Sequence, residues 1–237
     1  MATSGTTAFN LDLTELVEEA FERCGSEVRS GYDLRTARRS LNIMFSDWAN
    51  RGVNLWTVVN YSIPLLTGVQ SYNIDPNNDS NVTQGIVDIM DAVIRTNQSP
   101  LTNTTDLTIS RIALPTYMSI PNKFTQARPI QFYVERISPV PKVFVWPVPN
   151  TNEYTFYYSA LRRLQDAGSG SDTMDVPFRF IPAMTAGLAY YLSMKIAGGL
   201  ERMQALKMQY DEAWDLASSE DRDKSPVRFV PRQQFIS

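Results

Sequence analysis

Apolar residues recur at helical spacing near the start of the chain. In the first stripe Asp12 and Glu15 stand three residues apart, as in a capping box, and Gly25 follows the last apolar position. A second stripe begins after Asp33, the expected N-cap. The apolar positions of the two stripes are Leu13, Leu16, Val17, Ala20, Phe21 and Cys24, then Leu34, Ala37, Leu41, Met44, Phe45 and Trp48. The short link between the stripes predicts two antiparallel neighbouring helices.

Two further helices are expected near the end of the chain. Residues 178–197 are apolar on nearly all sides, which indicates a helix buried by several neighbours. Asp175 is its expected cap, Pro177 its first-turn proline, and Gly198 ends it. Its longest apolar stretch, Phe180 to Met194, is bounded by Arg179 and Lys195. This stretch is shorter than the roughly 20 residues that cross a bilayer, so a buried helix and no membrane contact are expected. A last amphipathic stripe consists of Met203, Leu206, Tyr210, Ala213, Trp214 and Ala217.

Between residues 54 and 165 the pattern changes to short alternating runs that are rich in β-branched and aromatic residues. Polar, Thr-rich or Pro-rich segments separate these runs, and residues 107–116 have room for one short helical turn. Strands are expected at 56–63, 71–74, 86–95, 130–137, 142–146 and 153–160. Because prolines are tolerated at strand starts, edges and turns, the region is interpreted as a small antiparallel sheet or barrel.

Together these elements predict an α+β protein. The N- and C-terminal helical pairs bury their stripes most simply against each other, as a four-helix bundle into which an antiparallel β-rich domain is inserted. The expected divisions are an N-terminal helical pair (1–53), the β-rich insertion (54–165), a C-terminal helical pair (166–220) and an extended C-terminal docking tail (221–237).

Composition narrows the chemistry more than any motif does. The 237 residues include no histidine, which removes the commonest general base and zinc ligand. The single cysteine, Cys24, lies on an apolar stripe and is expected to be buried rather than reactive. No phosphate-binding glycine loop is present, residues 1–10 do not resemble a signal peptide, and the net charge is −3. We therefore expect no enzyme activity, no cofactor and no metal ion.

Two carboxylate-rich segments allow other interpretations. Asp75, Asp79, Asp88 and Asp91 lack the spacing of a calcium-binding loop and are better explained as solvated residues. The acidic face of the first helix contains enough carboxylates for glycoside hydrolysis, but an exposed face gives little cause for the raised pKa that a catalytic acid needs. The residues of that face are Glu15, Glu18, Glu19 and Glu22.

Charged residues on the first two helices suggest protein contacts instead. Arg35, Arg38 and Arg39 lie off the second apolar stripe, and Glu18 and Glu22 lie off the first. Arginines in this arrangement pair with carboxylates of a neighbouring surface, in the same chain or in another copy, more often than they bind nucleic acid. A basic nucleic-acid module is the rival interpretation, and it predicts affinity that falls steeply with salt.

The residues after 221 alternate basic with aromatic or aliphatic side chains and include Pro226 and Pro231, which forbid a continuous helix. Such a segment suits docking on a partner in an extended form, and the alternative is a tail that folds back on its own chain. The candidate docking residues are Arg228, Phe229, Val230, Arg232 and Phe235.

The order and texture of the chain resemble those of tailed-phage head-to-tail adaptor proteins, also called connectors, of the tail tubular protein A or tail accessory factor type. The segments that carry the resemblance are LTEL at 13–16, ARRSLN at 37–42, WANRGVNLW at 48–56, LTGVQSYNI at 66–74, the strand at 88–95, VWPVP at 145–149, AYYL at 189–192 and the run 206–214. The resemblance covers most of residues 11–220, contains no catalytic signature and is weakest after residue 221.

The resemblance implies a virion structural protein at the head–tail junction (the neck), made in the host cytoplasm. Such adaptors form a ring, typically of about twelve copies, under the portal protein, and DNA passes transiently and non-specifically through the lumen. The C-terminal tail is then expected to reach the portal, the β-rich domain to face a tail nozzle or tail fibre protein, and residues Glu18, Glu22, Arg35, Arg38 and Arg39 to join subunits. Rival assignments are another tail or baseplate component and a cell-wall hydrolase.

Overall fold

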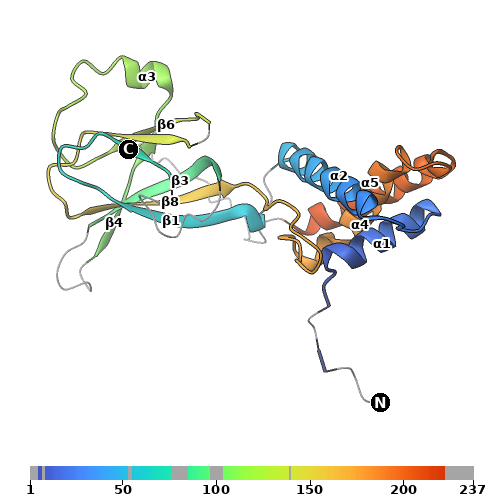
Figure 1. The fold of residues 1–237 in the computed structure, drawn as a ribbon. Helices are drawn as coiled ribbons and strands as arrows, with labels where there is room; N and C mark the ends of the chain where they lie inside the picture. The colour runs from blue at the N-terminus through green and yellow to red at the C-terminus, as the bar shows by residue number, and fades with distance from the viewer. Residues whose placement is uncertain are drawn as a thin grey trace, which may run out of the picture.

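The computed structural model describes residues 5–6, 9–52, 55–75, 85–96, 104–138 and 140–221. It confirms the α+β class: four longer helices gather at one end of the molecule and two sheets at the other (Figure 1). The longer helices are α1 (Leu13–Cys24), α2 (Gly31–Asn50), α4 (Ile181–Ser193) and α5 (Met203–Glu220). A short helix, α3 (Leu114–Met118), and the 3-10 turns η1 (Leu55–Thr57), η3 (Phe178–Phe180) and η4 (Gly199–Glu201) complete the helical elements described.

The first helix begins and ends as its sequence predicts. The side chain of Asp12 accepts from the Glu15 amide at 2.8 Å, and the Glu15 carboxylate accepts from the Asp12 amide at 3.3 Å. Both bonds satisfy amides that lack partners at a helix start. Gly25 has φ 78°, a left-handed conformation that favours glycine, and its N–H donates to the last turn.

The prediction of Asp33 as the N-cap of the second helix is wrong. Helix α2 begins at Gly31, with Ser30 in the cap position. Asp33 is the third helical residue, and its Oδ2 accepts from the Ser30 amide at 3.1 Å. The carboxylate therefore stabilises the helix start from inside the first turn, which is the second half of a capping box.

The predicted start of the third long helix is also wrong. Pro177 precedes the 3-10 turn η3, and α4 itself begins at Ile181 with Pro182 in its first turn. Asp175 does not cap this helix, because its carboxylate is bound by the guanidinium of Arg162. The first-turn proline was therefore expected at the wrong position, five residues too early.

One hydrophobic cluster joins helices from both ends of the chain. Its buried residues come from α1, α2, α4 and α5, and α4 packs against each of the other three. Ten residues of α4 are buried, which confirms the expectation of a helix covered on several sides. Trp48 of α2 is fully buried, and its ring Nε1–H donates to the Tyr210 hydroxyl of α5 at 2.7 Å.

Gly187 of α4 lies directly against side chains of α2 and α5. A Cβ on this residue would lie 2.5 Å from Met44 Sδ of α2 and 2.8 Å from Tyr210 Cε2 of α5. A side chain here would have to displace atoms of a packed core. Glycine at 187 therefore leaves room for the side chains of Met44 and Tyr210 against α4.

We expect Gly187→Ala to lower the free energy of unfolding by about 1–2 kcal/mol, because overpacking outweighs the gain in helix propensity. Gly31→Ala is the matched control, since no atom lies within 4 Å of its added Cβ and it too is in a helix. Urea unfolding of both variants measures the difference. Equal midpoints for the two variants would contradict the close packing at Gly187.

The described residues of the β-rich part form two four-stranded sheets, not the single sheet or barrel expected. One has the order β1-β8-β3-β4 and the other β2-β7-β6-β5. All described pairings are antiparallel except β5 with β6. The strands are β1 (Val58–Pro64), β2 (Ser71–Asn73), β3 (Ile86–Thr96), β4 (Thr105–Thr108), β5 (Ser110–Arg111), β6 (Gln131–Glu135), β7 (Lys142–Trp146) and β8 (Tyr154–Arg162). Both sheets contribute to a second hydrophobic cluster, separate from that of the helices.

Six of the eight strands lie where the alternating pattern predicts them, and α3 lies within the segment given room for a helical turn. Strands β4 and β5 were not expected, because their residues are mostly polar and exposed. Trp56 was assigned to the first strand but lies in η1, where its ring packs on Phe180 of the helical core at a centroid distance of 4.4 Å.

Candidate interaction surfaces

The five charged residues expected to join subunits are all exposed: Glu18 and Glu22 on α1, and Arg35, Arg38 and Arg39 on α2. The structure does not bring the two groups together. Within the described part of the chain no ion pair joins any of these carboxylates to any of these guanidinium groups. Pairing inside one chain, which the sequence left open, is therefore not present among the described residues.

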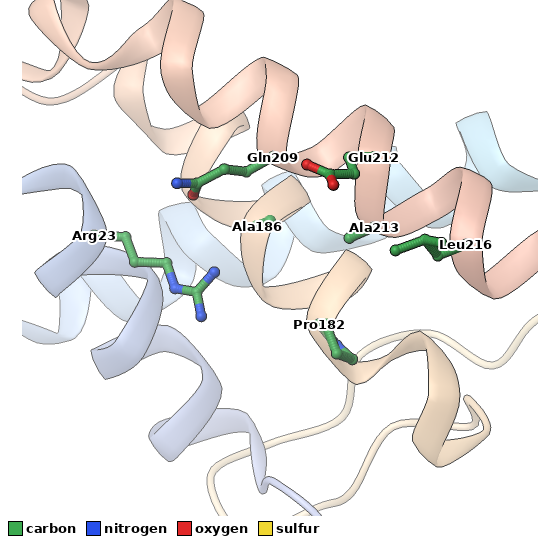
Figure 2. A pocket seen from close by; sticks show the side chains of 7 residues that line it. All are labelled: Arg23, Pro182, Ala186, Gln209, Glu212, Ala213 and Leu216. Atoms are coloured by element: carbon green, nitrogen blue, oxygen red, sulfur yellow. The ribbon is translucent and has the colours of Figure 1, made fainter.

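The carboxylates of α1 border a groove that runs over α4, between α1 and α5. Figure 2 shows the hollow nearer α5, with Arg23 on α1, Pro182 and Ala186 on α4, and Glu212 and Leu216 on α5. Two adjoining hollows of about 510 and 480 Å³ form the groove, and they share Arg23 and Pro182. We call this feature the α4 groove. Its lining residues are Phe9, Leu11, Glu15, Glu18, Glu19, Glu22, Arg23, Ile181, Pro182, Thr185, Ala186, Gln209, Glu212, Ala213 and Leu216.

The α4 groove is acidic at its rim and largely apolar along its floor. Five carboxylates and one guanidinium line it, and the Glu19 carboxylate accepts from Arg23 Nε at 2.8 Å. Glu15 is occupied by the capping box of α1. Glu18, Glu22 and Glu212 therefore supply negative charge that no cation of the described residues neutralises by an ion pair. An electrostatic partner of the groove must be basic.

On α2, the exposed face combines arginines with large apolar side chains. Tyr32, Arg35, Arg39 and Ile43 follow one another at spacings of three or four residues, so they form one stripe along the helix. We call these four residues the α2 stripe. Arg38 lies beside it, and its guanidinium donates to the Gly168 carbonyl at 3.4 Å. The α2 stripe is thus an exposed basic and apolar surface, and only Arg35 and Arg39 of it were identified from the sequence.

Two other sites that suggest chemistry, Asp88 and the pair Lys195 and Ser40, have structural explanations. Asp88 of β3, one of the four aspartates considered for calcium, accepts hydrogen bonds from Arg111 and Arg136, which ties together strands of both sheets and the segment after β6. Lys195 donates to Ser40 Oγ at 2.7 Å, but Ser40 is fully buried and its hydroxyl donates to the Thr36 carbonyl. A nucleophile would need access that this hydroxyl lacks.

Cys24 is buried, as expected. Its thiol donates to the Ala189 carbonyl at 3.1 Å, and burial raises the pKa of the thiol to about 11. A thiol that stays protonated at neutral pH is a poor nucleophile. Cys24 therefore acts as core packing between α1 and α4.

The predicted docking residues Arg228, Phe229, Val230, Arg232 and Phe235 lie outside the described residues, which end at 221. Sequence reasoning missed Glu212 and Leu216, because α5 gives no sign of which neighbour its exposed face adjoins. It also missed exposed apolar side chains on and after α3, at the far end of the β-rich part: Leu114, Met118 and Phe124.

An acidic groove and a basic stripe on helices that share one core define a protein suited to contacts with other protein surfaces. A family model described as SU10 adaptor protein matches residues 12–230. The chain therefore belongs to the SU10 adaptor protein family. A comparison with curated proteins gives no significant match.

Membership in this family makes the chain a structural adaptor of a bacteriophage and a component of the virion. The family implies contacts with other head and tail proteins and with further copies of the adaptor. Among the described residues, no helix has the length and apolar character needed to span a membrane.

Proposed function

We propose that the chain is a head-to-tail adaptor that forms a ring of about twelve copies in the neck of the virion, between the portal protein and the tail. The family match over residues 12–230 carries this proposal, because the matched range includes all four longer helices and both sheets. A lumen through the ring would let DNA pass at ejection. The net charge of −3 suits this role, since a basic lumen would retain DNA electrostatically.

Within this ring we assign a different task to each part of the chain. The helices build the wall of the ring. Their single core includes residues from both ends of the sequence, which supports the division into two helical pairs around an insertion at 54–165. The β-rich part, with its separate core and exposed apolar residues near α3, would meet a tail nozzle or tail fibre protein. This arrangement follows the tail tubular protein A type of adaptor.

The C-terminal tail is assigned to the portal on its sequence alone. Residues 222–237 contain four basic residues and one acidic residue, together with phenylalanines that would be costly to leave in water. An extended segment of this kind binds through alternating anchors in apolar and acidic sites of its partner.

Deletion of residues 222–237 is expected to weaken binding to the portal protein of the same phage at least tenfold, because the segment supplies both apolar anchors and positive charge. Binding is measured by biolayer interferometry on immobilised portal rings. Alanine at Gln233 and Gln234 is the control, and it should bind as the full chain does. Unchanged affinity after the deletion would show that another surface contacts the portal.

A further inference from the structure

The α4 groove combines exposed apolar side chains with carboxylates that form no ion pair within the described ranges, as expected of a surface that a partner covers in an assembly. Leu216, on its wall, is 65% exposed, and Pro182 and Ala186 open onto its floor. The adjoining carboxylates of Glu18, Glu22 and Glu212 form no ion pair with the described residues. An apolar channel rimmed by unneutralised carboxylates calls for an occupant that is itself apolar and basic.

The α2 stripe has that composition. Tyr32 is 67% exposed and Ile43 is 51% exposed, and the guanidinium groups of Arg35 and Arg39 lie between them along the helix. A row of apolar and basic side chains at three- and four-residue spacing is the form in which one helix inserts into the groove of another protein.

The two surfaces lie on opposite sides of α4. Pro182 and Ala186 face the groove, whereas Gly187 contacts Met44 of α2. Figure 2 looks onto the groove and shows α2 behind α4. One copy therefore cannot place its own stripe in its own groove, because its core lies between them.

We propose that the α4 groove of one copy receives the α2 stripe of the next copy, an inference that rests on the proposed ring. Each copy then uses its groove on one side and its stripe on the other, which is a head-to-tail contact that repeats and closes into a ring. A symmetric contact between two grooves would set carboxylates against carboxylates, which disfavours a closed dimer. The arginines pair with Glu18, Glu22 and Glu212 at the rim, while Tyr32 and Ile43 cover the apolar floor.

The contact is tested by reversing charge on one side at a time. The groove variant carries Glu18→Arg, Glu22→Arg and Glu212→Arg, and the stripe variant carries Arg35→Glu and Arg39→Glu. Each variant alone is expected to form rings at a yield at least tenfold below that of the unaltered chain, because like charges then face each other. Ring yield is measured by native mass spectrometry at high protein concentration and on portal rings.

Mixing the two variants is the decisive experiment, because it restores opposite charges at each contact between groove and stripe. The positive groove of one variant accepts the negative stripe of the other, and the remaining pair of surfaces is also opposite in charge. Equal amounts are therefore expected to restore rings in which the two variants alternate. Matched controls are Asp211→Arg and Lys207→Glu, exposed residues of α5 that do not line the groove and whose reversal should leave ring yield unchanged.

The outcomes separate this contact from the proposed function. Rings formed normally by each variant alone would overturn the contact while leaving the adaptor ring in place. Two folded variants, as judged by circular dichroism, that stay monomeric when mixed would also overturn it. Ring loss on deleting residues 222–237, with the stripe variant unaffected, would identify the tail as the occupant of the groove instead. Failure of the unaltered chain to form rings, alone or on the portal, would contradict the proposed function itself.

Discussion

Replacing Trp48 with alanine is expected to lower the free energy of unfolding by about 3–5 kcal/mol, the range for deleting a buried tryptophan from a core. Trp48 is fully buried, and its ring contacts those of Phe180 and Trp214 at centroid distances of 5.9 and 4.8 Å. These two residues belong to the C-terminal helical region, so the substitution removes contacts between segments about 130 residues or more apart.

The substitution also removes a buried hydrogen bond. The Tyr210 hydroxyl would lose the ring N–H of Trp48 as a donor, and an unpaired buried polar group adds to the loss of stability.

Burial raises the pKa of Tyr210 to about 12, so this hydroxyl stays protonated at neutral pH. In the unfolded chain the phenol ionises near its ordinary pKa of about 10. The stability that Tyr210 contributes is therefore present below pH 10 and is lost as pH rises towards 12.

Guanidinium unfolding, followed by far-ultraviolet circular dichroism, measures the effect of Trp48→Ala. Ser46→Ala is the matched control, since Ser46 lies exposed on the same helix two residues earlier. We expect the control to change the free energy of unfolding by less than about 0.5 kcal/mol. A loss below 1 kcal/mol for Trp48→Ala would contradict a single core shared by the two ends of the chain.

Replacing Asp175 with alanine is expected to lower the free energy of unfolding by about 2–3 kcal/mol. Arg162, at the end of β8, donates from both terminal nitrogens to Asp175, which lies in the segment leading to α4. The side chains are 12% and 22% exposed, so the loss falls at or just below the range for removing one partner of a fully buried pair. Hydrogen bonding to Asp175 raises the pKa of Arg162. The guanidinium stays charged without this partner as well, because the ordinary pKa of arginine lies far above neutral, so the substitution leaves a largely buried charge unpaired.

Asp106→Ala serves as the comparison for this prediction. Arg95 and Asp106 form a similar two-bond pair between β3 and β4, but their side chains are 35% and 44% exposed. Because solvent screens such a pair, its loss should cost less than about 1 kcal/mol. Equal losses from Asp175→Ala and Asp106→Ala, measured by urea unfolding, would show that the Arg162 pair does not connect the sheets to the helices as strongly as its burial indicates.

The elements that could be predicted from the sequence are those in which one face is buried. The apolar stripes of α1, α2 and α5 appear directly as helical spacing, and six strands appear as alternation. The capping box of Asp12 and Glu15 is equally local, so sequence alone identifies it. In each case the residues that decide the structure are neighbours in the chain.

The predictions that were wrong concern features that depend on residues distant in sequence. Asp175 matches a helix cap locally, but the guanidinium of Arg162 binds its carboxylate and the helix begins six residues later. Trp56 has strand propensity, yet Phe180, more than a hundred residues away, draws its ring into the helical core. One sheet or barrel was predicted and two sheets are observed, because the alternating pattern does not specify which strand pairs with which.

The candidate surfaces also combine features that neighbouring residues determine with features that distant residues determine. Exposure of the charges on α1 and α2 follows from helical periodicity, and all five residues are exposed. The α4 groove was not predicted, because it requires knowing that α5 lies alongside α4 opposite α1. A groove is a property of packed helices and has no signature within any one of them.

The most direct test of the account is mass photometry of the purified chain, alone and mixed with the portal ring of its own phage. Each bound copy adds 26.8 kDa, so the number of copies on a portal ring can be counted. If the chain forms the neck ring, each portal ring gains about twelve copies, and this number stays the same when the chain is added in excess. A folded chain that does not associate with the portal would contradict the assignment to the head–tail junction and would place the adaptor elsewhere in the virion.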